Sequence, residues 1–195
     1  MTKPAAMTEL EAVNVLLTTI GEAPVNTLSG KQTTDVAIAQ QILNEVNREV
    51  QSRGWHFNTE YDVELIPDNS KHITPPTDAV RIDVEDLDTV IRNNKLFRLD
   101  TRTNLFEAKI KARIIYLQDF LVLPEPARRY IATRAARIYS DRMLNSESMN
   151  RFLVRDEQSA LIDLKEFEGD TAKHSMMDSF SVARILNRGR RRMLL

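Results

Sequence analysis

The sequence predicts an α+β protein: a mainly α-helical bundle of about four helices, an inserted small antiparallel β subdomain and an extended C-terminal arm. Three observations carry this prediction. Apolar residues recur at helical spacing up to Gly54, alternate with polar residues from 57 to 65, and return to helical spacing after Pro124. We therefore expect a helical body at residues 1–55 and 118–169, a β subdomain at 56–117, and an arm at 170–195.

The first two helices are recognised by their ends. Thr8 and Glu11 form a capping-box pattern ahead of apolar residues at helical spacing. Gly21 supplies the left-handed residue that ends a helix of about 12 residues. The polar loop at 21–34 contains Pro24, and its GEAPV turn is expected to set how the first helix folds back. A second helix follows the loop and ends at Gly54.

The segment 56–117 has the character of short strands. Apolar and polar residues alternate from Phe57 to Leu65, which is typical of a half-buried strand. A second alternation spans 80–84, and a β-branched run spans 110–117. The pair Asn93-Asn94 predicts a tight hairpin turn, because asparagine tolerates positive φ.

Helical spacing returns in the last third of the chain. The Pro124-Glu125-Pro126 group is typical of a helix start, and a fourth helix is expected at 148–168. At the earlier change from helix to strand, Trp55 and Phe57 follow the glycine directly. We predict that these two aromatic residues clamp the β subdomain onto the helical body, with a cost of about 3 to 5 kcal/mol for Trp55→Ala if its ring is fully buried.

The composition fits a globular chain without disulfides. Of the 195 residues, 42% are hydrophobic and 28% are charged, which is close to globular averages. The absence of cysteine excludes disulfides, thiolate metal sites and cysteine nucleophiles. No apolar run reaches the roughly 18 to 20 residues of a membrane-spanning helix, and no signal-peptide pattern opens the chain. We expect a cytosolic folding compartment and no membrane partner.

Reactive motifs are scarce. The histidines His56, His72 and His174 lie in separate segments, without the spacing of a metal site. His174, Ser175 and Asp178 are the residue types of a hydrolase triad, but no GxSxG elbow is present. The five glycines form no phosphate-binding loop. A cluster of acidic residues also lacks the pattern of a calcium-binding loop. It consists of Asp83, Glu85, Asp86 and Asp88. We expect no catalytic, metal-binding or cofactor-binding residues.

The charge is distributed unevenly along the chain. The net charge of −1 is the balance of a tail at residues 179–195, which carries +5, and a remainder that carries −6. Such a tail is suited to an acidic protein or nucleic-acid surface, although a solvated terminus is the simpler alternative. The arm residues expected to bind are Phe180, Arg184, Ile185, Arg188, Arg190, Arg191 and Arg192.

Two stretches carry a family resemblance. AVNVLLTTIGEAPVNTLSG (12–30) and ILNEVNREVQSRGWHFNTE (42–60) resemble the tail tubular protein A family of short-tailed, T7-like bacteriophages. The resemblance is close over the first 60 residues. From 61 to 145 it concerns the order of the predicted elements more than the identity of individual residues. It implies a structural virion protein of the tail, assembled in the host cytoplasm, without cofactors and without turnover.

The resemblance also implies partners. The family's role would be that of a head-to-tail adaptor or gatekeeper: a homo-oligomeric, dodecameric ring that connects the portal protein to the tail nozzle protein. DNA would pass through its channel without sequence recognition during genome ejection. We expect lateral subunit contacts through Arg128, Arg129 and Arg137 against acids of the neighbouring copy, and portal docking through the arm.

Two functions of other classes stay open at this point. A tail-associated hydrolase of capsule or peptidoglycan glycans would need two facing carboxylates roughly 5 to 9.5 Å apart, and spacing in the sequence cannot pair the available acids. A DNA-contacting module would use arginines of the third helix, and its affinity would fall steeply with salt.

Overall fold

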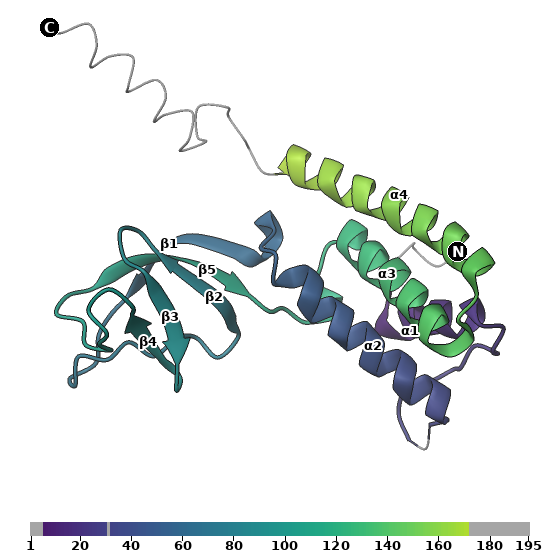
Figure 1. Cartoon of the computed structure of the whole chain (residues 1–195), viewed down its shortest axis with the longest axis horizontal. Coiled ribbons are helices and arrows are strands. Elements are labelled where there is room, and N and C mark those ends of the chain that lie inside the picture. The colour runs from purple at the N-terminus through teal and green to yellow at the C-terminus, as the bar shows by residue number, and fades with distance from the viewer. Residues whose placement is uncertain (1–5, 31, 172–195) are drawn as a thin grey trace, which may run out of the picture.

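The described part of the chain forms four helices and five strands, which separate into two lobes (Figure 1). The computed structural model describes residues 6–30 and 32–171. The helical body contains α1 (Glu9–Thr19), α2 (Thr34–Gln51), α3 (Glu125–Leu144) and α4 (Glu147–Thr171). The β subdomain contains β1 (Thr59–Leu65), β2 (Ala79–Val84), β3 (Thr89–Arg92), β4 (Lys95–Arg98) and β5 (Ile110–Tyr116). The α+β class predicted from the sequence is confirmed.

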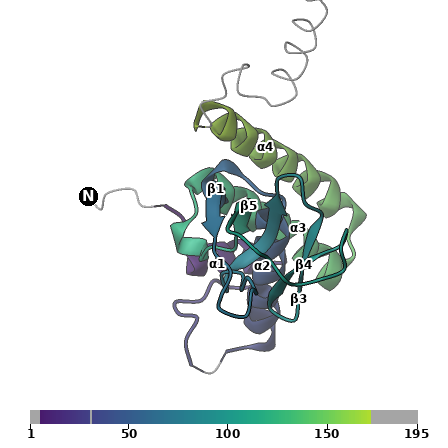
Figure 2. The same ribbon diagram turned by 90° about the vertical axis from the view of Figure 1, so that its left-hand side faces the viewer.

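Helix α3 is the centre of the helical body. It packs against α1, α2 and α4, and its buried side includes Tyr130, Ile131 and Tyr139, each no more than 1% exposed. Viewed from the β end, α4 lies along one side of the body and the loop between α1 and α2 along the opposite side (Figure 2). No helix in the described part of the chain is long and apolar enough to cross a membrane.

The predicted helix ends are formed by local hydrogen bonds. The Glu11 amide donates to Thr8 Oγ1 at 3.2 Å, and the Thr8 amide donates to the Glu11 carboxylate at 2.7 Å. Gly21 has φ of +86° and follows the C-cap of α1. The GEAPV turn is attached to α1 by Asn14, whose side chain bonds both the N–H and the C=O of Val25 at 2.8 and 2.9 Å.

The fourth helix is longer than predicted. It continues through Gly169 to Thr171, so residues 170 and 171, which were assigned to the arm, are helical. A single glycine inside a helix costs only about 1 kcal/mol relative to alanine, which is too little to end a helix that packs along α3. The rest of the predicted arm lies outside the described residues.

The β subdomain has its own hydrophobic core. Strands β1, β5 and β2 form an antiparallel sheet in that order, and β3 and β4 form a hairpin. Asn93 and Asn94 have φ of 50° and 55°, so the predicted Asn-Asn turn is confirmed. The residues buried in this core are Leu65, Ile73, Ile82, Leu96, Phe106, Ala112 and Ile114, separate from the core of the helical body.

Strand β1 departs from the simple alternation that the sequence suggests. Glu60 pairs with Ile114 and Val63 with Ala112, so two residues of β1 face one residue of β5, which is a β-bulge. Asp62 takes a positive φ of 56° there. The extra residue moves Tyr61 to the outer face of the sheet, where it is 62% exposed, instead of the core face that the period-two pattern predicts.

A buried polar junction joins the two lobes. Gln51 at the end of α2 bonds Gln118 twice: its Nε2 donates to the Gln118 carbonyl at 2.9 Å, and its Oε1 accepts from the Gln118 amide at 2.8 Å. Asn58 donates to the carbonyls of Gln51 and Tyr116 at 3.0 and 2.8 Å. These hydrogen bonds connect the end of α2 to both strand ends that enter and leave the β subdomain.

Trp55 and Phe57 lie beside this junction on the helical side. Their rings stack with centroids 6.4 Å apart, both are partly buried, and both pack against the core of the helical body. The Trp55 Nε1 donates to the Val50 carbonyl at 2.8 Å. The predicted clamp therefore differs from the structure: the rings extend the helical core, and the polar junction provides the cross-links to the β subdomain.

Candidate functional site

The described residues contain no assembled reactive centre. No group of three or more His, Cys, Asp or Glu within residues 6–30 and 32–171 is placed to hold a metal ion. The His72 ring is 3.2 Å from the Asn104 carbonyl, and His56 is exposed at the other end of the β subdomain. The triad-like residues His174, Ser175 and Asp178 lie outside the described residues.

The acidic turn after β2 has the form of a solvent-facing loop. Glu85, Asp86 and Asp88 are exposed, and Asp86 occupies a turn position with φ of 62°. The partly buried Asp83 is engaged by Arg81, whose Nε lies 2.8 Å from the carboxylate. The four acids therefore do not converge on a common point.

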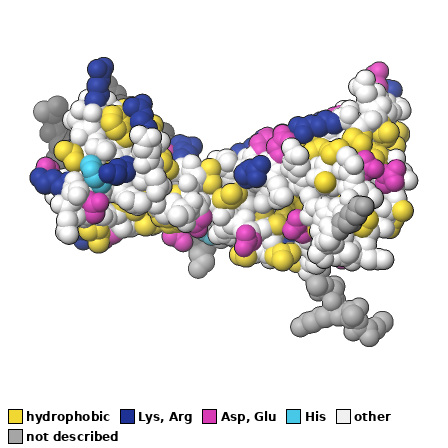
Figure 3. All heavy atoms as spheres, turned by 90° about the horizontal axis from the view of Figure 1, so that it is seen from below, with side chains coloured by type: hydrophobic (Ala, Val, Ile, Leu, Met, Phe, Trp, Pro, Cys, Tyr) yellow, Lys and Arg dark blue, Asp and Glu magenta, His cyan; other side chains and the backbone are white. Residues whose placement is uncertain are grey.

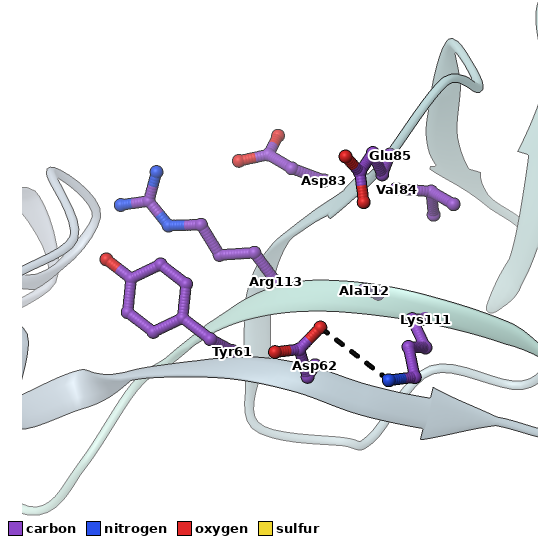
Figure 4. A pocket seen from close by; sticks show the side chains of 8 residues that line it. All are labelled: Tyr61, Asp62, Asp83, Val84, Glu85, Lys111, Ala112 and Arg113. Carbon is purple, nitrogen blue, oxygen red and sulfur yellow. Dashed lines mark ion pairs between the residues drawn. The ribbon is translucent and has the colours of Figure 1, made fainter. Parts of the chain in front are cut away.

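A shallow groove of about 560 Å³ lies on the outer face of the three-stranded sheet (Figure 4). It follows directly from the bulge in β1, which turns Tyr61 and Asp62 outward. The Arg113 guanidinium stands 5.4 Å from the centre of the Tyr61 ring, and Asp62 faces Lys111 at 4.0 Å. The lining mixes acids, bases and one aromatic ring, a surface suited to polar protein contacts.

The hydrolase hypothesis finds limited support in this groove. Its carboxylates are Asp62, Asp83 and Glu85. Two of the three already have a basic partner, because Asp62 faces Lys111 and Asp83 is bound by Arg81. Retaining and inverting glycosidases need two carboxyl groups that face each other across the sugar. Figure 4 shows the Asp62 side chain directed towards Lys111, on the β1 side of the groove.

Arg128, expected at a subunit interface, lies inside the subunit. It is buried, and its guanidinium donates to three backbone carbonyls: Leu123 at 2.7 Å, Met7 at 2.8 Å, and Leu121. These bonds tie the start of the described chain and the turn before α3 to α3 itself. Because a buried charge requires such partners, Arg128 is not available to a neighbouring copy.

Arg129 and Arg137 also have partners within the subunit. Arg129 is 58% exposed and lies 3.3 Å from Asp163 of α4. Arg137 binds Glu157 through its Nε and Asp141 at 3.1 Å. Of the three arginines, only Arg129 keeps enough exposed surface for the predicted lateral contact, which stays a prediction.

Glu157 is the hub that fastens α4 to α3. Its carboxylate accepts from Arg137 and, at 2.6 Å, from Arg134. Arg134 also reaches Glu49 of α2 at 2.7 Å, so three helices share one ionic network. Burial raises the pKa of the Glu157 carboxyl, but the hydrogen bonds from Arg137 and Arg134 outweigh it, and the net pKa is lowered.

This lowered pKa predicts a pH dependence of stability. The carboxylate is bound in the folded state, so its contribution is present above the ordinary pKa of 4.5 and is lost as the pH falls through the lowered folded-state value. We expect the free energy of unfolding from urea denaturation to fall as the pH is lowered from about 4.5 through the folded-state pKa of Glu157. Glu157→Gln should be less stable near neutral pH and should respond less to acid.

The matched control is Glu166→Gln, on the exposed side of the same helix. It should follow the wild-type profile. The range to measure is about pH 7 to pH 3, which includes the pH at which an ordinary carboxyl titrates. If the free energy of unfolding changes with pH in the same way for Glu157→Gln and for the wild type, the network does not contribute as described.

The three most exposed large apolar side chains in the described part of the helical body are Leu121, Val122 and Phe152. Leu121 and Val122 are 57% and 66% exposed on the short 3-10 turn η2 (Phe120–Val122), and Phe152 of α4 is 64% exposed. On the face seen in Figure 3, hydrophobic and acidic side chains lie side by side over the helical body. These residues belong to no motif in the sequence, and the available signal for them was the adjacent pair Leu121 and Val122 before Pro124.

The predicted arm residues cannot be placed. Phe180, Ile185 and the arginines at 184, 188 and 190–192 lie outside the described residues.

Comparison with known proteins relates the chain to tail proteins of bacteriophages. A family described as "Tail tubular protein" matches residues 10–174, which include every helix and strand except the first residue of α1. The chain is also 24% identical over 163 residues to "Tail tubular protein A" of Klebsiella phage KP34, covering 82% of this chain and 87% of that protein.

Proposed function

Because the chain belongs to the tail tubular protein family, we propose that its copies form an adaptor ring of about twelve subunits between the portal of the phage head and the tail nozzle. The coarser role follows from the family itself: the chain is a structural protein of a bacteriophage tail, within the virion, and it interacts with other tail or portal components. The family match along residues 10–174 is the observation that carries the proposal.

The geometry is consistent with a building block. The two lobes are joined by a hydrogen-bonded junction, and the helical body is cross-linked by the Glu157 network. The family is a structural one, which points away from an enzyme. A ring subunit of this kind would act as a gatekeeper through assembly, and DNA would pass through the channel without sequence recognition.

The proposed portal contact lies in the arm. The five arginines between residues 179 and 195, with no acid among them, would be steered by an acidic portal surface, and Phe180 and Ile185 would anchor the contact. Several arms on one ring would slow detachment through multivalency. In this proposal the ring is assembled in the host cytoplasm.

The test is binding of the purified full chain to the portal ring of the same phage, followed by native mass measurement. We expect a complex of one portal ring with several copies of this chain. Removing residues 179–195 should leave the unfolding curve unchanged and weaken portal binding, most at low salt, because screening already reduces arginine contacts at high salt. A truncated chain that binds as tightly as the full chain would exclude the arm as the portal contact.

The same preparation tests the alternative function. Incubation of the full chain with purified capsular polysaccharide or peptidoglycan should release no reducing sugar. Release that is lost in Asp83→Asn or Glu85→Gln, with portal binding intact, would establish a second activity in the groove of Figure 4.

A further inference from the structure

The turn before α3 presents a preformed apolar ledge, which we define as Leu121 and Val122. Their neighbours Phe120 and Leu123 are buried, so the two exposed side chains are held from both sides. Arg128 fixes the backbone, because its guanidinium donates to the carbonyls of Leu121 and Leu123. A surface that is already ordered loses little conformational entropy when it is covered.

The charges around the ledge are mainly acidic. A hollow beside it is lined by Glu9 of α1, Asp119 and Arg48 of α2, together with uncharged residues. Asp119 lies two residues before the ledge and is exposed, and it forms no ion pair within the described part of the chain. A partner that covers the ledge would therefore be favoured by basic residues around an apolar centre.

Such a surface exists on α4 of the same chain. We define the Phe152 patch as Phe152 with Arg151 and Arg155, which line a shallow hollow of about 340 Å³ together with Ser148. Neither arginine forms an ion pair among the described residues, in contrast to Arg134, Arg137 and Arg142 of the neighbouring helix. Phe152 is 64% exposed and lies between two arginines that have no ion-pair partner in residues 6–30 and 32–171.

The two surfaces cannot meet within one subunit. The ledge precedes the first residue of α3, and the Phe152 patch follows its last turn. A helix of 20 residues is about 30 Å long. The hollow at the ledge is lined by α1 and α2, whereas the patch lies on α4, along the other side of the body (Figure 1, Figure 2). Two unlike surfaces at opposite ends of a subunit suit a head-to-tail contact.

We propose that the ledge of one copy packs on the Phe152 patch of the next copy, with Glu9 and Asp119 facing Arg151 and Arg155. This inference rests on the proposed ring and names its lateral interface. The contact removes Leu121, Val122 and Phe152 from water, and the surrounding charges select the orientation of one copy on the next. Because the contact is heterologous, it extends from copy to copy until rotation closes it.

The first test uses disulfide cross-linking, which the natural absence of cysteine makes clean. The double variant Val122→Cys/Phe152→Cys, oxidised alone at high concentration and on the portal ring, should give a ladder of covalent species longer than dimers. Each single variant can give dimers at most. The matched control pairs Val122→Cys with Ile66→Cys, a residue 71% exposed on the β subdomain, and should give no ladder.

The second test exchanges the charges. Arg151→Glu/Arg155→Glu and Glu9→Lys/Asp119→Lys should each abolish assembly, because each brings like charges together at every contact. Combining all four changes in one chain, or mixing the two variants, should restore it. Lys165→Glu, exposed on α4 away from the patch, should assemble like the wild type.

The outcomes separate this inference from the proposed ring. Wild-type rings on the portal, with no ladder from the Val122/Phe152 pair and normal assembly of the charge variants, would overturn the inference and leave the ring intact. No ladder from the Val122/Phe152 pair, together with a wild-type chain that binds no portal, would overturn both. A ladder without portal binding would support the lateral contact and contradict the adaptor role.

Discussion

Replacing Gln51 by alanine is expected to lower the free energy of unfolding by about 2 to 4 kcal/mol, since each buried polar group left without a partner costs about 1 to 3 kcal/mol. Gln51 is 0% exposed. Its amide satisfies both the N–H and the C=O of Gln118 and donates to Asn47 at 2.9 Å. The truncation would leave backbone groups at the entrance to the helical body unpaired. Urea denaturation followed by circular dichroism measures the change.

The matched control for this variant is Gln41→Ala on the same helix. Gln41 is exposed, so its truncation should change stability by no more than about 0.5 kcal/mol. Near-equal midpoints for the two variants would show that the junction adds nothing to stability.

Gly54→Ala is expected to destabilise the protein by about 2 to 4 kcal/mol, through two separate causes. Gly54 has φ of +76°, where an alanine costs about 1 kcal/mol. A Cβ would also stand 2.5 Å from Cδ1 of Ile115, which is fully buried in β5, and such overpacking costs about 1 to 3 kcal/mol. The unfolding midpoint in urea is again the measurement.

Two other glycines separate these causes. Gly21 has φ of +86° but open space around its Cβ position, so Gly21→Ala should show the backbone cost alone. Gly169 is helical and also open, so Gly169→Ala should stabilise by about 0.5 to 1 kcal/mol. Equal losses for Gly54→Ala and Gly21→Ala would mean that Ile115 moves aside without cost.

Features set by neighbouring residues were predictable from the sequence. The Thr8–Glu11 cap and the Asn93-Asn94 turn each depend on residues within three positions, and the structure confirms both. The bulge in β1 has no comparable signal. In the sequence, Tyr61 and Val63 alternate with polar residues whether or not the strand contains a bulge, so the pattern does not reveal the register shift between them. Helix propensity also could not reveal that α4 continues through Gly169, since the packing of α4 on α3 determines where this helix ends.

Contacts between distant residues were not predictable. Gln51 and Gln118 are 67 positions apart, and nothing in their neighbourhoods indicates a pair. Arg128 was expected outside because charged residues are rarely buried, and its three carbonyl partners are assembled only by the fold. The ledge and the Phe152 patch were missed for the same reason, because exposure depends on which face the neighbouring elements cover.

The bulge in β1 also bears on solubility. β1 is an outer strand of its sheet, and a regular outer strand invites unwanted strand addition and fibre growth. The bulge breaks the even spacing of its free N–H and C=O groups, and the outward side chain of Asp62 is 78% exposed. Removing the bulge by deleting Asp62 would produce a regular edge that is prone to aggregation. One extra residue in β1 therefore protects this edge of the sheet against strand addition from another chain.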